Sequence, residues 1–304
     1  MSRRIAVTGA SGFIGRHVAA HLAARGDSVV AVRRPFERAA LLETLRGADA
    51  VVHLGGVVSA LRERDYIAAN VDGTRAVAEA ARAAGVPLIH ISSLAAAGPA
   101  SPRAPRSEDE RPAPINAYGR SKLEGERVIA SVDGLRWTIL RPGVVYGPGD
   151  RALLPVFRLA ARGLLPLVGR ADAAYSFVHI ADLVRAITAA VDSPAAGDTM
   201  FVGHPQPVAA RDLLEGIRAA SGVRARIVRI PLAVTRLAAV AGDVGGMLRG
   251  RPAVINSRRY AELASEGFVC RVDRLRERLG VVAQIGLREG LADACAWYRK
   301  EGWL

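Results

Sequence analysis

The stretch VTGASGFIG, residues 7–15, decides the fold of this chain. It follows a short apolar run, precedes a helix-like pattern and places three glycines at intervals of three residues. The first glycine permits a tight turn, the second lets backbone approach a pyrophosphate, and the third lets helix and strand pack closely. A helix that starts here offers free N–H groups to phosphates, so we predict a dinucleotide site. The residues expected to contact the dinucleotide are Gly9, Gly12, Phe13, Ile14 and Gly15.

Outward from this turn, strand and helix patterns alternate through the first half of the chain. The expected strands cover residues 4–10, 28–34, 48–56, 87–93 and 137–145, and the expected helices cover 13–26, 38–47, 67–85 and 118–131. Such alternation favours an α/β fold, a doubly wound parallel sheet with helices on both faces. The second half is less regular, with a strand and helix over 175–191 and helices over 208–222, 232–244 and 272–280.

Composition restricts the class of protein. Of the 304 residues, 50% are hydrophobic and 23% are charged, which is typical of a soluble globular chain. The net charge is +13, but aromatic residues make only 5%, so we expect no nucleic-acid partner and interpret the excess as arginine usage on the surface. Two cysteines make no disulfide framework, and no apolar segment reaches the roughly 20 residues of a spanning helix. We therefore expect a cytoplasmic protein without a membrane partner.

The end of the second expected strand bears on the choice between NAD and NADP. A carboxylate there accepts a hydrogen bond from the ribose 2′-hydroxyl, whereas an arginine suits a 2′-phosphate. In this chain the strand ends in Arg33 and Arg34, with no carboxylate beside them. We therefore favour NADP over NAD.

The stretch INAYGRSKLEGE, residues 115–126, holds Tyr118 and one of only two lysines, Lys122. Four residues apart on a helix, the two side chains share a face. A free phenol has a pKa of about 10, and a neighbouring ammonium group favours the phenolate. A compact ammonium group also suits two ribose hydroxyls better than a guanidinium does. We predict Tyr118 as a general acid/base, with Lys122 holding the nicotinamide ribose and lowering the pKa of Tyr118.

A third catalytic group is expected at the end of the fourth strand. Ser93, in the stretch HISSLAAAG, precedes Tyr118 by one loop and would donate a hydrogen bond to the reacting oxygen. Ser92 is the neighbour with which it could be confused. His17 and His21 are spaced for one helix face, but no third ligand accompanies them, so we expect no metal site.

Together these motifs resemble the extended short-chain dehydrogenase/reductase family, which holds NAD(P)-dependent epimerases, dehydratases and hydroxysteroid-type dehydrogenases. The resembling stretches are the glycine motif, VVHLGG at 51–56, NVDGT at 70–74, the serine pair, Tyr118 with Lys122, and LRPGVVYGPGD at 140–150. The resemblance covers essentially the whole chain. It implies a Rossmann-type fold with a smaller, discontinuous C-terminal substrate domain, and a homodimer formed through the helices that carry Asn70 and Tyr118.

The resemblance also implies further coenzyme contacts. Backbone after the third strand would run along the coenzyme, an asparagine would anchor its ribose side, and a Pro-Gly pair would flank the nicotinamide. The matching residues here are Leu54, Gly55, Gly56, Asn70, Pro142 and Gly143.

The chain departs from the family pattern between Arg34 and Val51. Relatives usually place a further strand and helix there, so we expect the sheet to lack an edge strand and the adenine contacts to be reduced. The expected dinucleotide-binding domain covers 1–150, with 174–202 returning to it. The expected substrate domain covers 151–173 and 203–304.

This chain lacks residues that two branches of the family carry, and their absence restricts the reactions that we expect. Family dehydratases carry an acidic pair after the active-site hydroxyl residue, where this chain has SSLAAAG, and epimerases often carry an asparagine where this chain has Val144. We therefore expect an oxidoreductase that interconverts a secondary alcohol and a ketone on a small, non-sugar substrate, similar to the hydroxysteroid-dehydrogenase and dihydroflavonol-reductase branches. Two alternatives stay open: a nucleotide-sugar 4-epimerase with tightly bound NAD, and a non-catalytic dinucleotide-binding subunit.

Overall fold

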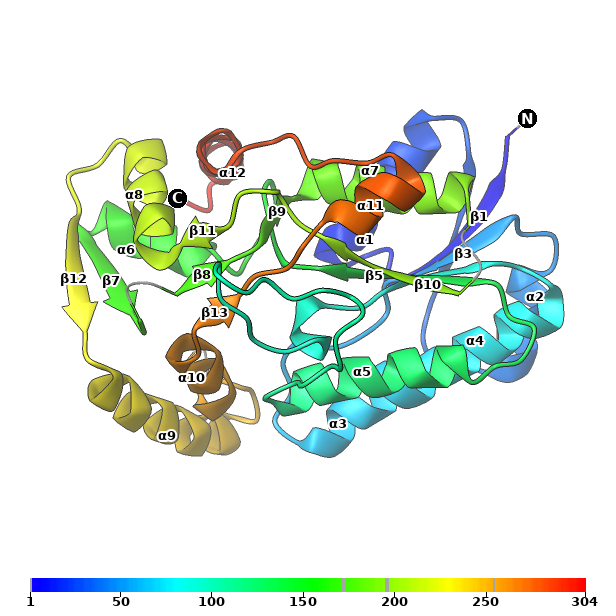
Figure 1. Ribbon diagram of the computed structural model, residues 1–304, viewed down its shortest axis with the longest axis horizontal. Coiled ribbons are helices and arrows are strands. Elements are labelled where there is room, and N and C mark those ends of the chain that lie inside the picture. Colours follow the sequence, from blue (N-terminus) through cyan, green and yellow to red (C-terminus); the bar gives the residue numbers. More distant parts are fainter. Residues whose placement is uncertain (1, 171–172, 195–196, 254) are drawn as a thin grey trace.

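The computed structural model of the protein describes residues 2–170, 173–194, 197–253 and 255–304. Its centre is a six-stranded sheet in the order β10-β5-β4-β3-β1-β2, in which every neighbouring pair of strands is parallel (Figure 1). Parallel strands are buried on both faces, which explains near-continuous apolar runs such as RIAVT. The strands are β1 (Arg4–Thr8), β2 (Ser28–Val32), β3 (Ala50–His53), β4 (Leu88–Ile91), β5 (Trp137–Pro142) and β10 (Asp198–Val202).

Helices cover both faces of this sheet (Figure 1). Along β1, Ile5 and Val7 pack into the core beneath α1 and α7, whereas Ala6 packs into the core beneath α2 and α4, because side chains alternate along a strand. One face carries α1 (Phe13–Ala24), α7 (Ile180–Asp192) and α11 (Asp273–Leu279), and the other carries α2 (Arg38–Leu45), α4 (Gly73–Ala84) and α5 (Ala117–Ala130). Shorter segments are α3 (Glu63–Ile67), the π-helical turn η1 (Ala68–Asp72) and the 3₁₀ turn η2 (Leu94–Ala96).

The predicted α/β fold with a parallel sheet is confirmed. Between β2 and β3 the chain forms α2 and no strand, and every residue of that segment is described. Strand β2 is therefore the edge of the sheet, as the short spacing between Arg34 and Val51 predicted.

The single helix expected over residues 67–85 is interrupted in the structure. The π-helical turn η1 separates α3 from α4, so the helix has a wider turn at Asn70. A Cβ placed on Gly125 of α5 would lie 2.5 Å from the carbonyl oxygen of Asn70. The interruption therefore brings the backbone of η1 into close contact with α5.

The strand expected over residues 137–145 is also divided. Strand β5 ends at Pro142, and the chain continues as β6 (Val144–Tyr146) in a different sheet. At the junction, a Cβ on Gly143 would lie 2.1 Å from the carbonyl oxygen of Ser176. The chain passes so close to this backbone that it can change direction only at a residue without a side chain.

The part of the chain outside the main sheet builds a second, smaller core, in which Phe157, Ile217, Leu291 and Tyr298 are fully buried. It contains two small sheets of two strands each, β6 with β9 and β7 with β12, and one sheet of three strands in the order β11-β8-β13. Besides β6, its strands are β7 (Leu164–Val168), β8 (Ala174–Tyr175), β9 (Phe177–His179), β11 (Val208–Ala209), β12 (Arg226–Ile230) and β13 (Gly267–Phe268). Its helices are α6 (Leu154–Ala161), α8 (Ala210–Ser221), α9 (Leu232–Arg249), α10 (Ser257–Ala264) and α12 (Leu287–Lys300). The domain limits drawn from the sequence stay a prediction.

A helix that crosses a bilayer must be both long and apolar. Within the described residues, no helix meets both requirements.

Candidate active site

Backbone contacts between glycines close the turn after β1. Gly9 has φ +68°, a left-handed conformation that glycine adopts without strain. Its carbonyl accepts the N–H of Gly12 at 2.9 Å, and a Cβ built on Gly15 would lie only 2.1 Å from the same oxygen. Because this oxygen belongs to the backbone, a side chain at position 15 would force the turn or the helix to move.

The first turn of α1 has no side-chain partner for its N–H groups. The helix begins after Gly12, no side chain caps it, and its first turn contains no acidic residue. Phe13 and Ile14 begin the helix and pack their side chains against the main core, so only their backbone faces the turn. An uncapped helix start behind a glycine-closed turn fits the pyrophosphate of a dinucleotide, and these residues could hold it.

Thr8 ties the end of β3 to the glycine turn. Its Oγ1 accepts the N–H of Gly55 at 3.0 Å and lies 2.7 Å from Nδ1 of His53. A Cβ on Gly9 would lie 3.0 Å from the carbonyl carbon of Leu54. The backbone after β3 therefore runs directly beside the turn, where a bound dinucleotide would extend.

Asn70 is fully buried in η1 and holds the segment after β3 in place. Its side-chain oxygen accepts the N–H of Val57 at 2.8 Å, and its amide nitrogen donates to the carbonyl of Val57 at 3.1 Å and to Oγ of Ser121 at 2.9 Å. A Cβ on Gly56 would lie 2.8 Å from the same Asn70 oxygen. The side chain therefore connects this segment to α5, and π-helical turns of this kind are frequent at functional sites.

Arg33 and Arg34 follow β2 and are exposed. The guanidinium group of Arg34 donates to the carbonyl of Ala69 at 3.3 Å and lies 5.6 Å from the centroid of the Phe36 ring. Positive charge therefore lies at the carboxyl end of the edge strand β2. This is the position at which the 2′-phosphate of a bound NADP would require positive charge.

Tyr118 lies in the first turn of α5. Asn116 caps this helix, because its side-chain oxygen accepts the N–H of Gly119 at 2.8 Å. Ser93 follows β4, is partly buried and lies near enough to the Tyr118 phenol to lower the pKa of Tyr118. The structure therefore brings together two side chains that a loop separates in sequence.

Ser92 is occupied elsewhere. It is buried and donates a hydrogen bond to Glu126, whose carboxylate also receives Arg141 through contacts of 2.9 and 2.6 Å. Of the serine pair, only Ser93 faces Tyr118.

Lys122 is buried one helical turn beyond Tyr118. Its Nζ donates to the carbonyl of Ile91 at 2.8 Å and lies 3.3 Å from Nε2 of His90. Burial lowers the pKa of Lys122 to about 8, although the negative charge of Glu126 acts in the opposite direction. The ammonium group is therefore held at the end of β4, with a pKa much closer to neutrality than that of an exposed lysine.

Arg258, on α10, is a site residue that the sequence analysis missed. Its guanidinium carbon lies 5.7 Å from the centroid of the Tyr118 ring, and it donates to the carbonyl of Val58. Burial raises the pKa of Tyr118, whereas the hydrogen bond from Ser93 and the positive charge of Arg258 act to lower it. The sequence analysis assigned this lowering to Lys122. In a chain rich in arginine, no local pattern distinguishes Arg258.

Pro142 and Gly143 lie at the carboxyl end of β5, next to β4. The N–H of Gly143 donates to the carbonyl of Val202 at 2.9 Å, which fixes the backbone at this end of the sheet. The glycine turn, the arginines, the segment after β3, Ser93 and this Pro-Gly pair therefore all follow the carboxyl ends of parallel strands, where ligands of such sheets bind.

In the described part of the chain, no group of three or more His, Cys, Asp or Glu side chains is placed to hold a metal ion. His17, one of the two histidines on α1, has its Nε2 2.8 Å from the carbonyl of Pro148.

Comparison with known proteins identifies one family. The sequence model of the NAD-dependent epimerase/dehydratase family matches residues 5–203, from β1 to just beyond β10. Ceramide reductase from Caulobacter vibrioides is 30% identical, with 99% of this chain and 96% of that protein aligned. The 2-alkyl-3-oxoalkanoate reductase from Stenotrophomonas maltophilia is 29% identical, with 95% of this chain and 97% of that protein aligned.

A solved structure is similar over the same length. MoeE5 in complex with UDP-glucose and NAD superposes with a TM-score of 0.79 and 25% sequence identity, covering 98% of this chain and 99% of MoeE5.

Proposed function

The chain belongs to the NAD-dependent epimerase/dehydratase family, and from that premise we propose that it reduces a ketone to a secondary alcohol on a non-sugar substrate that carries an alkyl chain. The resemblance to extended short-chain dehydrogenase/reductases drawn from the sequence is thereby confirmed, as is the expectation of an NAD(P)-dependent enzyme. The observation that carries the proposal is that α5 carries Tyr118 and, one turn later, the buried Lys122, whose Nζ donates to the Ile91 carbonyl at 2.8 Å at the end of β4, the strand that Ser93 follows.

Each side chain has a separate role in the proposed reaction. When bound, NADPH or NADH would supply the hydride for the carbonyl carbon. As the carbon–oxygen π bond breaks, Tyr118 gives its proton to the oxygen, and Ser93 donates a hydrogen bond to the negative charge that develops there. Arg258 favours the phenolate that Tyr118 leaves behind. Lys122 would hold ribose hydroxyls of the coenzyme.

The substrate class rests on two kinds of support. The relatives reported above act, by name, on a ceramide and on a 2-alkyl-3-oxoalkanoate, both of which carry alkyl chains. Beyond Gly143, the chain has the apolar Val144 at the position where many sugar-nucleotide epimerases place an asparagine, followed by the apolar Val145, and both are partly buried. An apolar wall suits an alkyl chain better than a nucleotide diphosphate.

The preferred coenzyme in this proposal is NADP. Its support is the pair of exposed arginines after the edge strand β2, in the absence of a carboxylate beside them in the sequence. Titration of the protein with NADPH and with NADH tests this preference directly, and tighter binding of NADH would contradict it.

The second candidate function is a nucleotide-sugar 4-epimerase with tightly bound NAD. The likeness to MoeE5 in complex with UDP-glucose and NAD favours it. The two functions differ in net redox chemistry, because an epimerase returns the hydride that it takes and shows no net turnover of coenzyme.

The deciding experiment supplies NADPH with a 2-alkyl-3-oxo acid, and in parallel UDP-glucose without added coenzyme. Net oxidation of NADPH with the oxo acid supports the reductase, whereas retained NAD with interconversion of the sugar supports the epimerase. The Tyr118→Phe variant is the control, since removal of a general acid costs about 10²–10⁴-fold in turnover while coenzyme binding survives. If turnover were unchanged in this variant, Tyr118 would have no catalytic role. Coenzyme binding by the wild type without turnover of either substrate would instead support a non-catalytic dinucleotide-binding subunit.

The homodimer and the cytoplasmic location stay predictions. The outward sides of the helices expected at the dimer interface carry ion pairs, among them Arg120 with Glu63 at 2.9 Å and Arg127 with Glu124 at 3.2 Å. Analytical ultracentrifugation of the wild-type protein tests the oligomeric state.

A further inference from the structure

Helix α9 exposes an apolar face along its whole length. Large apolar side chains recur at steps of three or four residues, with one adjacent pair, so they share one side of the helix. Between 53% and 84% of each side chain is exposed. They are Val234, Leu237, Val240, Val244, Met247 and Leu248.

The opposite side of α9 is the one that packs against the protein. Thr235 and Ala239 are buried there, and a Cβ on Gly242 would lie 2.0 Å from the carbonyl oxygen of Ile255. No residue of α9 belongs to any of the hydrophobic cores found among the described residues. In Figure 1, α9 lies at the edge of the molecule with α10 beside it. Exposed apolar patches of this extent usually mark an interaction surface.

Positive charge borders the apolar face. With 100° between successive residues, Arg236 and Arg249 fall on its two flanks. From residue 216 to residue 261 the sequence contains nine arginines and a single acidic residue, Asp243, which is half-buried and bonded to Ser257.

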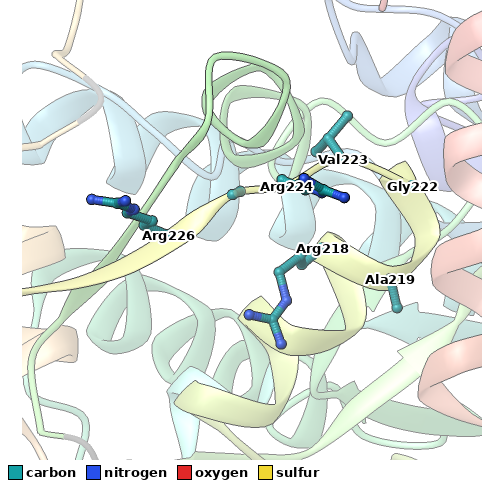
Figure 2. A pocket seen from close by; sticks show the side chains of 7 residues that line it. Arg218, Ala219, Gly222, Val223, Arg224 and Arg226 are labelled. Atoms are coloured by element: carbon teal, nitrogen blue, oxygen red, sulfur yellow. The ribbon is translucent and has the colours of Figure 1, made fainter.

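Further exposed arginines lie before α9 in the chain, on the strand that leads into it and at the start of that strand. Figure 2 shows a depression between the end of α8 and the start of β12, surrounded by the side chains of Arg218, Arg224 and Arg226. On β12 itself, Arg226, Val228 and Arg229 are exposed. The combination of exposed apolar and cationic side chains therefore extends over neighbouring elements.

We propose that α9 lies on the surface of an anionic lipid bilayer, with its apolar face in the boundary between headgroups and acyl chains. An apolar face flanked by arginines is the pattern of helices that lie in the plane of a membrane interface. Guanidinium groups at its borders reach the level of the lipid phosphates, and the surrounding arginines are attracted by the negative surface potential. The sequence analysis expected no membrane partner because it considered only helices that span a bilayer.

Helix α10 links this face to the candidate active site. It follows α9, contains no buried residue, and is attached to α5 by a hydrogen bond of 2.9 Å from Asn116 to Glu262. It also carries Arg258, which stacks on Tyr118. A bilayer beneath α9 would therefore place the site near lipid. Only this consequence, the delivery of an alkyl-chain substrate, rests on the proposed function.

The wild-type chain tests the inference by co-sedimentation with vesicles. Vesicles that mix phosphatidylcholine with the anionic phosphatidylglycerol should retain the protein, and vesicles of phosphatidylcholine alone should retain much less. Raising the salt concentration should weaken retention, because surface charges are screened. Equal retention by both kinds of vesicle, or by neither, would overturn the proposal.

Paired variants locate the surface. The double variant Leu237→Ser with Leu248→Ser should bind the anionic vesicles at least about ten-fold more weakly, because it lacks two leucine side chains that the bilayer would otherwise bury. Its control, Val282→Ser, removes an exposed apolar side chain from the segment between α11 and α12 and should bind normally; in Figure 1 this segment lies on the opposite side of the molecule from α9. Normal binding by the double variant would overturn the proposal.

Charge variants test the arginine border. Arg236→Gln and Arg249→Gln should each weaken binding about five-fold, whereas Arg46→Gln, an exposed position just after α2, should have no effect. A uniform effect of all three would mean attraction by net charge alone and would contradict a specific surface.

Two further measurements separate the possible outcomes. Sedimentation velocity without lipid shows whether the α9 face instead joins two copies of the chain: a dimer that the leucine variant converts to monomer, without vesicle binding, would overturn the proposal.

Reduction of a short, water-soluble ketone should be the same in wild type and leucine variant, which shows that the variant is folded. Failure of that reaction in both, with vesicle binding intact, would count against the proposed function and leave the membrane surface standing.

Discussion

Gly15 of α1 and Gly245 of α9 are both glycines within a helix, but their surroundings differ. In α1, a side chain at Gly15 would collide with the carbonyl of Gly9, so the missing side chain is what allows the helix to approach the turn. In α9, a side chain at Gly245 would meet no atom within 4 Å. The first helix is fixed by close backbone contact within the chain, whereas the second leaves its outer side free for something outside the chain.

This difference separates two kinds of constraint. Around α1, residue identity is dictated by contacts that also shape the dinucleotide site, so a substitution should affect folding and coenzyme binding together. Around α9, the outer residues make no core contacts within the described chain, so a substitution there should leave folding nearly unchanged. The candidate site draws on the main sheet and on the C-terminal part, since Lys122 comes from α5, which covers the sheet, and Arg258 comes from α10, which follows α9.

The Gly15→Ala variant should have the largest effect. The added methyl group would lie 2.1 Å from a backbone oxygen, and neither the turn nor α1 can move without disturbing β1. We expect the free energy of unfolding to fall by about 3 kcal/mol and coenzyme binding to be lost. Urea denaturation and a coenzyme titration measure the two effects. Wild-type behaviour in both would show that the region around the turn is looser than its contacts indicate.

The next prediction concerns the pH dependence of stability at Lys122. Burial lowers its pKa from an ordinary value of 10.5 to about 8, so between these pH values the unfolded chain binds more protons than the folded chain. Its contribution to the free energy of unfolding should therefore be complete above pH 10.5 and be lost as pH falls to 8, a difference of about 3 kcal/mol.

The Lys122→Met variant isolates this contribution. Burial raises the pKa of Cys270 and of the buried tyrosines, so these groups make the folded state less stable in the same alkaline range. Only the difference between wild type and variant is therefore informative. Urea denaturation from pH 7.5 to pH 10 should show wild type gaining stability relative to the variant. Parallel curves would mean that the ammonium group is exposed to water.

The parts of the molecule that could be predicted from sequence depend on residues close together in the chain. The glycine turn and the Tyr118–Lys122 pair are set by spacings of three and four residues, and the main strands are long enough to show an apolar pattern. The edge position of β2 followed from the segment between Arg34 and Val51, which is too short for a further strand and helix. In each case one local physical rule determined the outcome.

The rest depends on contacts between distant segments. Strands β8, β11 and β13 have two residues each, too few for any periodic pattern. Arg258 acts on Tyr118 only because the C-terminal part folds back over α5, and α10 contains no buried residue that would mark its position in advance. The roles of Lys122 and Arg258 toward Tyr118 could therefore be distinguished only in three dimensions.

The contribution of the C-terminal part to catalysis is tested by Arg258→Gln. Loss of the positive charge should raise the pKa of Tyr118, so alcohol oxidation at a fixed pH below that pKa should become slower. Oxidation needs the phenolate and rises with pH, so its rising limb should move to higher pH. A pH profile of the oxidation rate measures the shift.

Two neighbouring variants control this result. Arg259→Gln removes the same charge one residue further along, from a side chain that pairs with Glu262 at 3.2 Å, and should leave the profile in place. Arg258→Lys keeps the charge and should restore most of the wild-type profile. If Arg258→Lys shifted the limb as far as Arg258→Gln does, the effect would come from packing against the ring.

The smallest expected effect completes the comparison of the two helices. Gly245→Ala adds a methyl group inside α9 where space is open, and alanine is a better helix former than glycine. The free energy of unfolding should therefore rise by about 1 kcal/mol, opposite in sign to Gly15→Ala. Gly250→Ala is the control, because Gly250 ends the same helix with φ +65°, where alanine is strained and stability should fall. A loss of stability in Gly245→Ala, measured by urea denaturation, would mean that this side of α9 is already covered, and the contrast with α1 would not hold.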